Sequence, residues 1–306
     1  MHTGHAGHVP TKAVLLIVGS VLCFTLLDTI VKHLAPHYPI PLLVWARLTF
    51  QAVAMLIWLG PTMRLNLLRT PRVGMQVARG ILIVASSFLF MSALKYLPLA
   101  EATAISYSSP VLVVLMAVLF LNEQMSAPRI AFVLAGISGM LMIVRPGTDV
   151  FHGATLLALL AACVYSTYQI LTRKVAAEDP RVTLFYPGLV GAVVMTAILP
   201  FVDIKTQMPF VDIVLVCAAG LLGTLGHLLF ILAFQRGPAS ALIPFTYMQL
   251  VWATLIGWFV FQDFPDQWAL TGMAVIAGSG LLIALYERRS ASIRIAALRA
   301  ADPAID

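Results

Sequence analysis

The sequence predicts an all-α membrane protein of ten transmembrane helices, and three observations support this prediction. First, the chain of 306 residues is 60% hydrophobic and only 10% charged, whereas soluble globular chains carry about 25% charged residues. Second, ten apolar runs are long enough to cross a bilayer as helices, which takes about 20 residues each. Third, Lys and Arg are distributed unequally between alternate connections. We therefore expect a multi-pass protein of the cell's inner membrane.

The ten runs leave no room for a soluble domain, because the connections are short and rich in Pro, Gly and charge, as at Gly60-Pro61. The predicted spans are Ala13–Leu34, Leu42–Leu59, Val73–Leu94, Leu99–Leu121, Pro128–Val144, Gly153–Arg173, Val182–Phe201, Val211–Phe234, Ala239–Phe261 and Gln267–Tyr286. The first run is too long for a cleavable signal peptide. Residues 1–12 and 288–306 are then short terminal tails.

The positions of Lys and Arg predict the orientation of the chain. If the N-terminus is cytoplasmic, 14 of the 19 Lys and Arg residues lie on the cytoplasmic side and 5 lie outside. Cytoplasmic connections of membrane proteins carry such an excess, so we expect both termini in the cytoplasm. The basic residues form no stripe along one face, so the net charge of +6 does not indicate nucleic-acid binding.

Motifs for enzymatic chemistry are absent from the sequence. Cys23, Cys163 and Cys217 lie in three different apolar runs without a CxxC pair, which argues against disulfides and a metal site. There is no P-loop, no HExxH and no GxSxG motif. We expect no cofactor and no enzymatic activity, so any transport would run on gradients of solute or protons.

An internal repeat divides the chain into two copies of five helices. The segment 93–123 aligns with 233–263 without a gap, 140 positions later. The matched pairs include Pro98 with Pro238, Ser106 with Thr246, Tyr107 with Tyr247, and Glu123 with Asp263. Because each copy (residues 13–147 and 148–287) has an odd number of helices, the second would cross the membrane upside down. Inverted repeats of this kind are typical of secondary transporters, whose binding site lies near the midplane.

The stretch Ala93–Pro110, running on to Leu121-Asn122-Glu123, resembles the signature of the drug/metabolite transporter superfamily, EamA type. The corresponding segment of the second half, 233–263, matches this signature less well, because Leu250 occupies the position of Pro110. Trp45-Ala46-Arg47 is similar to a second-span motif of the same family. The resemblance covers nearly the whole chain. It implies a ten-helix fold in the lipid bilayer that moves a small organic metabolite by alternating access, without specifying the substrate.

The front segment Phe24–Asp28, together with Trp45–Arg47, is most similar to the bacterial riboflavin-importer branch of that superfamily. This resemblance implies riboflavin uptake, with an amino-acid or other metabolite exporter as the alternative. A membrane scaffold or a lipid scramblase is the second alternative. Small residues such as Ala131, Ala135 and Gly139 suit packing within one chain or in a homodimer. No sequence pattern predicts the direction of transport or the coupling ion.

Ionisable residues inside predicted spans are the first candidates for function, because a charge at mid-bilayer costs at least about 2.5–3.5 kcal/mol. Asp28 either pairs with Lys32 one helical turn later or acts in a cavity. Arg47 either anchors the fold or binds an anionic group of the solute, or ties to Asp28. Glu101 either stabilises a helix start or binds a proton or cation. His227 either relays protons or is simply a hydrogen-bonded core residue.

Polar and aromatic residues gather in spans that the repeat relates to each other. A buried hydroxyl or amide needs a partner, which is either a neighbouring helix or a solute in a shared central cavity. We favour the cavity, because tyrosines stack on flat rings and hydrogen-bond their edges. The predicted substrate-binding residues are Arg47, Ser106, Tyr107, Tyr165, Tyr168, Gln169, Tyr247 and Gln249. Asp28, Glu101 and His227 are the candidates for proton or ion coupling.

Overall fold

The computed structural model describes residues 10–121, 126–147, 153–175, 177–204, 207–237 and 239–301, and these residues contain helices but no strand. The first half has α1 (Thr11–Leu34), α2 (Ile40–Met63), η1 (Arg64–Leu68), α3 (Val73–Leu94), α4 (Leu99–Ser106), α5 (Ser109–Leu121) and α6 (Ala127–Val144). The second half has α7 (Gly153–Lys174), α8 (Pro180–Ile198), η2 (Leu199–Phe201), α9 (Phe210–Phe234), α10 (Ala239–Thr246), α11 (Met248–Phe261) and α12 (Gln267–Ala301). The all-helical prediction is confirmed.

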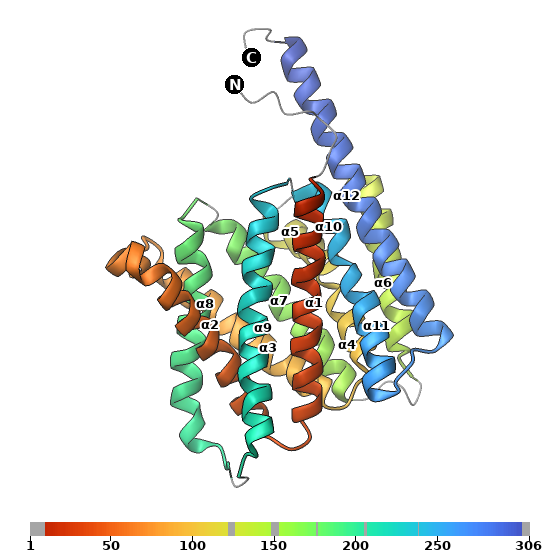
Figure 1. The fold of residues 1–306 in the computed structure, drawn as a ribbon. Coiled ribbons are helices and arrows are strands. Elements are labelled where there is room, and N and C mark those ends of the chain that lie inside the picture. The colour runs from red at the N-terminus through yellow and green to blue at the C-terminus, as the bar shows by residue number, and fades with distance from the viewer. Residues whose placement is uncertain are drawn as a thin grey trace.

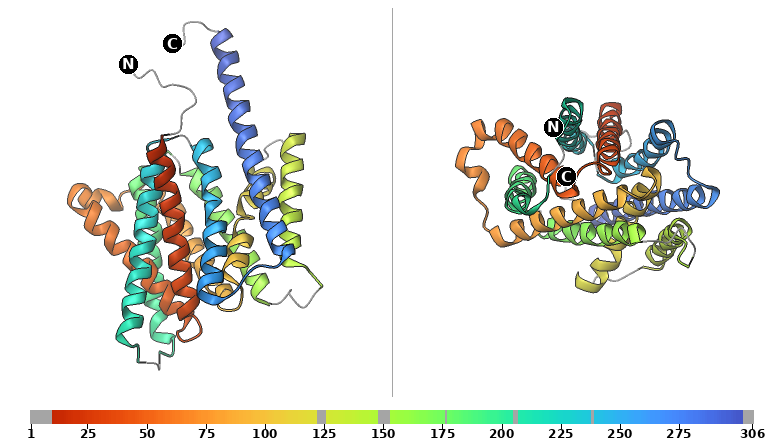
Figure 2. Two further views of the ribbon diagram at one scale, coloured as in Figure 1. Left: turned by 45° about the vertical axis from the view of Figure 1, so that its right-hand side comes forward. Right: turned by 90° about the horizontal axis from the view of Figure 1, so that it is seen from below.

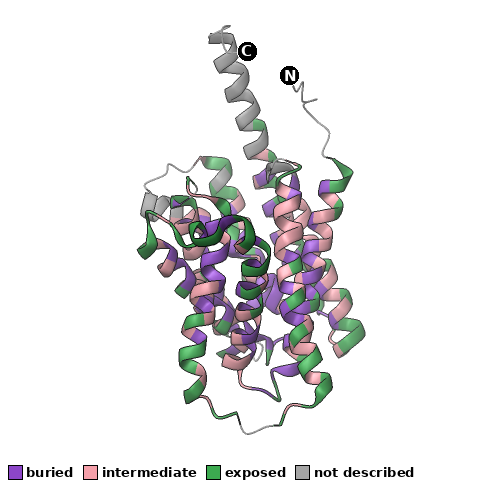
Figure 3. Cartoon of the chain, turned by 60° about the vertical axis from the view of Figure 1, so that its left-hand side comes forward, coloured by how far each residue is buried: buried purple, intermediate pink, exposed green. Residues whose placement is uncertain are grey.

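The described residues include nine helical segments that are long and apolar enough to cross a membrane, and a shorter apolar segment, Ile130–Val144 in α6. Large apolar side chains are also exposed along the outer faces of the bundle, including Ile57 at 71% and Phe259 at 68%. Figure 3 shows buried residues between the helices and exposed ones along their outer faces. Exposed apolar surface of this extent suits contact with lipid rather than water.

Helices from the two halves of the chain pack directly against each other (Figures 1 and 2). α1 packs on α9, α2 on α8, α3 on α7, α4 on α11 and α6 on α12. The main buried apolar cluster therefore draws on both halves. The end of the bundle at which α1 begins and α12 ends, the upper end in Figure 1, is called the N-terminal end below, and the opposite end is called the far end.

The fourth and ninth predicted spans are each interrupted near their middle. α4 ends at Ser106 and α5 begins at Ser109, directly before Pro110, which has no N–H to donate to the preceding turn. α10 contains Pro244 and ends at Thr246, and α11 begins at Met248. The two breaks occur at positions that the repeat relates, and each places a tyrosine at the interruption.

Two boundaries differ from those predicted. The second helix runs through Gly60 and Pro61, which the sequence suggested as a connection, and ends where Arg64 takes a positive φ of 48°. The last helix continues to Ala301, through most of the segment 288–306 that was predicted as a tail. That segment is rich in Ala and Arg and has no Gly or Pro before Pro303, so helix propensity favours continuation.

The small residues of predicted spans five and eight are used for packing within the chain. A Cβ at Gly139 in α6 would lie 2.8 Å from the carbonyl oxygen of Gly272 in α12. On α9, a Cβ at Gly226 would lie 2.7 Å from the Phe24 ring of α1. The hydroxyl of Ser20 donates a 2.7 Å hydrogen bond to the Gly226 carbonyl oxygen at the same contact. The glycines therefore permit the closest helix approaches in the bundle.

Replacement of Gly272 by Ala is expected to destabilise the fold. The added Cβ would lie 2.5 Å from the Gly139 carbonyl oxygen, and a backbone atom cannot move aside as a side chain can. Overpacking of this kind costs about 1–3 kcal/mol. Thermal unfolding of the purified variant in detergent measures the effect. Gly278→Ala on the same helix is the control, because nothing lies within 4 Å of a Cβ there. Equal melting temperatures for the two variants would contradict the packing argument.

Asp266 holds the start of α12 at the far end. Its Oδ1 accepts a 2.8 Å hydrogen bond from the N–H of Ala269, and its Oδ2 lies 2.7 Å from Nη1 of Arg145. The hydrogen bond from the Ala269 N–H has the largest effect on the Asp266 carboxyl. Together with Arg145 it outweighs desolvation, so the pKa of this carboxyl is lowered. A carboxyl with a lowered pKa stabilises the fold above its unfolded-state pKa, and that stabilisation disappears as the pH falls through the lowered value.

Replacement of Asp266 by Ala is expected to cost about 1 kcal/mol, the usual effect of losing a helix cap. The measurement is thermal unfolding at neutral pH and again below the ordinary aspartate pKa of about 3.9, where the stabilisation from a lowered pKa declines. The difference between wild type and variant should shrink at the lower pH. A difference that is constant between the two pH values would show that the carboxylate charge at Asp266 does not stabilise α12.

Candidate functional site

A cluster of polar and ionisable side chains lies in the interior where the two halves meet. We call it the central cluster, and its members come from α1, α2, α7, α9 and the two helix breaks. Its residues are Asp28, Arg47, Tyr107, Tyr165, Tyr168, His227, Tyr247 and Gln249. All eight were among the residues predicted from the sequence. The contacts below show how they are joined.

Asp28 is a buried carboxylate, with the residue 7% exposed on α1. Among the residues that the structure describes, its oxygens receive no hydrogen bond and form no ion pair within 4 Å. The charge of Arg47 acts on it. One alternative predicted from the sequence was an ion pair between Asp28 and Lys32, and the structure does not contain this pair. Lys32 Nζ instead contacts Asp263 Oδ2 at 3.5 Å and the Leu97 carbonyl oxygen at 2.6 Å.

Arg47 brings a positive charge from α2 into the same region. Its Nη1 lies 3.4 Å from Oγ of Ser87, at the long limit for a hydrogen bond. Its Nε is buried and has no hydrogen-bond partner among the described residues. The Arg47 charge acts on Asp28, Tyr165 and His227. A guanidinium has five N–H donors, so most of the donors of Arg47 are free for another partner.

Two opposite charges therefore lie near each other in the membrane interior without closing into an ion pair. Burying a charge without a partner costs several kcal/mol, and such a cost persists only where something else pairs with the charge. A ligand with one cationic and one anionic group would pair with both Asp28 and Arg47. The arrangement is thus suited to a zwitterion rather than to a neutral or singly charged solute.

Tyr107 joins the two helix breaks. Its hydroxyl oxygen lies 2.7 Å from the Thr246 carbonyl oxygen and 3.0 Å from Oε1 of Gln249. The Tyr107 and Tyr247 rings are in contact, with centroids 5.2 Å apart and planes inclined by 47°. The repeat-related tyrosines thus meet at the junction of the halves. Their position supports the prediction that both breaks contribute to one site.

Tyr165 and Tyr168 form a second aromatic pair on α7. Their rings stack, with centroids 5.7 Å apart and planes inclined by 22°. The charge of Arg47 acts on Tyr165, so this ring lies beside the ionic part of the cluster. Tyr168 also contacts Arg79, whose Nη2 lies 3.3 Å from the tyrosine hydroxyl. Aromatic faces next to a charge pair can hold a planar group of a solute.

His227 lies on α9 at the edge of the cluster. Its ring meets Phe24 of α1 edge to face, with centroids 4.9 Å apart, and the positive charge of Arg47 acts on it. A neighbouring positive charge disfavours protonation of an imidazole. This environment fits an aromatic packing residue better than the proton relay considered from the sequence.

Three predicted residues lie outside the contacts that define the cluster. Ser106 donates to the Ala102 carbonyl oxygen one turn earlier at 3.2 Å. Gln169 is half-buried on α7, and no hydrogen bond joins it to the cluster within the described part of the chain. Glu101 lies in the first turn of α4 and its charge acts on Lys32. Glu101 therefore belongs to the far end of the bundle, with Lys32 and Asp263.

A second polar group, around Arg79, was missed by the reasoning from sequence. Arg79 was counted as a cytoplasmic charge, although it is the seventh residue of the predicted third span. In the structure it is 1% exposed and surrounded by hydroxyl, amide and carbonyl groups. The position of Arg79 inside an apolar run was the sequence signal that could have identified it as a buried polar residue. Its partners come from distant parts of the sequence and left no pattern.

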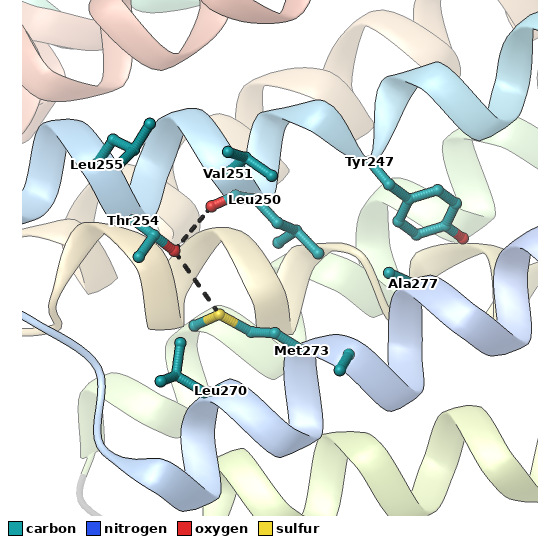
Figure 4. A pocket seen from close by; sticks show the side chains of 9 residues that line it. Tyr247, Leu250, Val251, Thr254, Leu255, Leu270, Met273 and Ala277 are labelled. Carbon is teal, nitrogen blue, oxygen red and sulfur yellow. Dashed lines mark hydrogen bonds between the residues drawn. The ribbon is translucent and has the colours of Figure 1, made fainter.

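An apolar groove lies between α11 and α12 (Figure 4). It has a volume of about 310 Å³ and is lined by Tyr247, Leu250, Val251, Thr254, Leu255, Leu270, Met273, Ala274 and Ala277. The Thr254 hydroxyl donates to the Leu250 carbonyl oxygen at 2.8 Å and lies 4.0 Å from Sδ of Met273. The groove has no charged lining residue, so it cannot recognise a charged solute as the central cluster can.

Comparison with known proteins matches most of the chain. The model of the EamA-like transporter family matches twice, at residues 11–145 and 152–285. The S-adenosylmethionine uptake transporter of Rickettsia bellii is 29% identical over 231 residues, 75% of this chain and 79% of the relative. The riboflavin transporter of Vibrio cholerae is 26% identical over 288 residues, 92% of this chain and 96% of the relative. A solved crystal structure covers 91% of this chain and 98% of its own, with a TM-score of 0.62 and 20% identity, and shows a shared fold.

Proposed function

Because the chain belongs to the EamA-like transporter family, we propose that it is a secondary transporter of a small zwitterionic metabolite in the inner membrane. The observation that carries this proposal is the pair formed by Asp28 and Arg47. Asp28 is buried and Arg47 is half-buried between the halves, their charges interact, and no ion pair within 4 Å joins them among the described residues. Such a pair is costly unless a ligand uses it.

The proposed architecture has ten spans in two inverted copies, residues 13–147 and 148–287, with both termini in the cytoplasm. Three facts support it. Tyr107 and Tyr247 occupy helix breaks 140 residues apart. The packing of α1 on α9 has its counterpart in that of α7 on α3, as expected for a twofold relation between the copies. The excess of Lys and Arg lies on the side of the N-terminus.

Transport would proceed by alternating access. The two halves would rock about the central cluster, which then faces the far end and the N-terminal end in turn. Among the coupling candidates, Asp28 fits best, because a carboxylate without a fixed partner can exchange a proton for the cationic group of a solute. Glu101 would act at the far entrance, since the charge of Lys32 acts on it there. The sequence has no P-loop, so gradients would drive the cycle.

The chemistry of the cluster specifies the proposed substrate. Arg47 would bind a carboxylate, Asp28 would bind an ammonium or sulfonium group, and the tyrosines would hold a planar ring. Tyr107, Tyr165 and Tyr247 are the ring contacts, with Tyr168 and Gln249 behind them. S-adenosylmethionine, the compound that the Rickettsia relative is named for, has all three groups.

Riboflavin is the second candidate, and a specific observation favours it. The cluster is rich in tyrosine, and the Vibrio cholerae riboflavin transporter aligns over 92% of this chain. However, riboflavin has a neutral flat ring and would leave Asp28 and Arg47 without partners. A lipid scramblase would need polar residues facing lipid, and the groove between α11 and α12 has a mostly apolar lining. A scaffold would need no buried charges, and an enzyme would need a catalytic set.

Solute counterflow into proteoliposomes without ATP tests this function. The panel contains S-adenosylmethionine, riboflavin, aromatic and neutral amino acids, and small carboxylates. We expect exchange of a zwitterion with an aromatic ring and little exchange of monocarboxylates. Exchange of riboflavin alone would remove the zwitterion proposal and leave the transporter proposal. No exchange with any compound would count against the whole substrate assignment.

A further inference from the structure

The N-terminal end of the bundle has a polar network, centred on the buried Gln76 and Arg79, that crosses between the halves. Its first-half members, on α3 and the turn before it, are Thr70, Gln76 and Arg79, and its second-half members are Tyr168, Thr172, Glu178 and Thr183. We call it the Arg79 network. Of these residues Tyr168 also belongs to the central cluster, so it links the network to the proposed substrate site.

Arg79 is the centre of this network and holds α3 against the second half. Its Nε donates to Oγ1 of Thr172 at 3.0 Å, and its Nη1 lies 3.3 Å from the Thr183 carbonyl oxygen. Its Nη2 lies 3.3 Å from the Tyr168 hydroxyl, and its guanidinium lies 5.1 Å from the Tyr168 ring centroid. It also donates to Oε1 of Gln76 on its own helix. Three of the four partners therefore lie across the interface.

Glu178 is the acidic member of the network, in the connection between α7 and α8. Its Oε2 accepts a 2.8 Å hydrogen bond from Nε2 of Gln76 and a 2.5 Å hydrogen bond from Oγ1 of Thr70. Desolvation acts to raise the pKa of Glu178, but these hydrogen bonds and the charges of Arg72 and Arg79 outweigh it and lower the pKa. Glu178 is therefore an anion at neutral pH and ties the turn before α3 to the second half.

Tight packing accompanies the polar bonds at this end. A Cβ at Gly80, next to Arg79, would lie 2.4 Å from Cβ of Val190 on α8. The hydroxyl of Tyr186 donates a 2.8 Å hydrogen bond to the Leu68 carbonyl oxygen, and an apolar cluster of α2, η1 and α8 residues lies beside it. No solute passes between α3, α7 and α8 unless these contacts separate.

We infer that the Arg79 network is the cytoplasmic gate of the transporter, which must break for the central cluster to open toward the N-terminal end. This inference rests on the proposed function. The network also contacts the substrate site, because Tyr168 binds Arg79 and stacks on Tyr165 of the cluster. A ring bound against Tyr165 and Tyr168 would compete with Arg79 for the Tyr168 ring, so substrate binding would weaken the gate. Arg79 is thus a positioning residue that acts through Tyr168.

The first test measures access to the cluster from the cytoplasmic side. Ser87 contacts Arg47, so Ser87→Cys, in a chain whose Cys23, Cys163 and Cys217 are replaced by Ala, reports that access. Inside-out vesicles are treated with a membrane-impermeant thiol reagent. Arg79→Gln should raise the labelling rate at least tenfold. Arg181→Gln is the control and should leave the labelling rate unchanged, because Arg181 is exposed and its side chain bonds to Asp179, two residues earlier in the chain.

The second test keeps Arg79 and locks the gate instead. Thr70 and Glu178 are in hydrogen-bond contact through the long side chain of Glu178, so cysteines at both positions, in the cysteine-free chain, can be joined by a short bifunctional methanethiosulfonate reagent, which forms a reducible disulfide link between them. The disulfide should reduce counterflow at least tenfold, reversibly with a reductant, while equilibrium substrate binding changes less than threefold. Full counterflow with the disulfide confirmed by mass, or unchanged labelling in Arg79→Gln, would overturn the gate. A wild-type chain that exchanges nothing would instead count against the proposed function.

Discussion

Replacement of Arg47 by Ala is expected to reduce transport at least tenfold and up to about 150-fold. A hydrogen bond to a charged group contributes about 1.5–3 kcal/mol, and each 1.4 kcal/mol corresponds to about a factor of ten. Among the described residues, Nε of Arg47 has no hydrogen-bond partner and its Nη1 makes one long contact, to Ser87, so its loss should affect the solute more than the fold. The measurement is the initial rate of counterflow, together with thermal unfolding of the purified variant.

Three further variants separate solute binding from a structural role of Arg47. Arg47→Lys keeps the charge but not the planar donor geometry, and should recover only part of the rate. Arg236→Ala removes an exposed arginine just after α9 whose side chain, within the described part of the chain, bonds to the Leu232 carbonyl oxygen, and should have no effect. The double variant Asp28→Asn, Arg47→Gln removes both charges. If Asp28 and Arg47 serve only to neutralise each other, that double variant would transport normally.

Replacement of Gly280 by Ala is expected to weaken substrate binding at least tenfold without unfolding the protein. A Cβ at Gly280 on α12 would lie 1.6 Å from the hydroxyl oxygen of Tyr247 and 2.3 Å from its Cζ. The end of a tyrosine side chain can swing away, so the fold survives. Tyr247 would then lose its ring contact with Tyr107, and a misplacement of about 1 Å at a binding or reaction site can cost a factor of about a hundred.

Gly278→Ala is the control for this variant, because it lies on the same helix and a Cβ there has no atom within 4 Å. The apparent KM for counterflow should rise in Gly280→Ala and stay unchanged in Gly278→Ala. Melting temperatures should agree within the error of the measurement for both. A normal KM in Gly280→Ala would show that Tyr247 does not contact the solute.

Most of the fold could be predicted from local sequence properties. Apolar runs locate the helices to within a few residues, since a span needs a minimum apolar length. The extension of α12 to Ala301 was missed because the prediction stopped where the hydrophobic signal stopped, whereas helix propensity continued. Pro110 and Pro244 each account for a kink, but the full interruption of the helices at Tyr107 and Tyr247 depends on tertiary contacts.

The candidate site was predictable where a charged or polar residue lies in an otherwise apolar span. Asp28, Arg47, Tyr107 and Tyr247 stand out as charged or polar groups in apolar spans, two of them repeated at an offset of 140. Partners across the bundle were not predictable, because no local pattern encodes them. The contact of Lys32 with Asp263 joins residues 231 positions apart in the sequence.

The central claim is that Arg47 binds the carboxylate of a zwitterionic solute inside the membrane. The most direct measurement is equilibrium binding of the transported zwitterion and of its decarboxylated analogue to wild type and to Arg47→Ala. Removing the carboxylate should weaken binding at least tenfold in the wild type and less than twofold in Arg47→Ala, because that variant lacks the guanidinium that binds the carboxylate. An equal loss in both proteins would contradict the claim and place the carboxylate elsewhere.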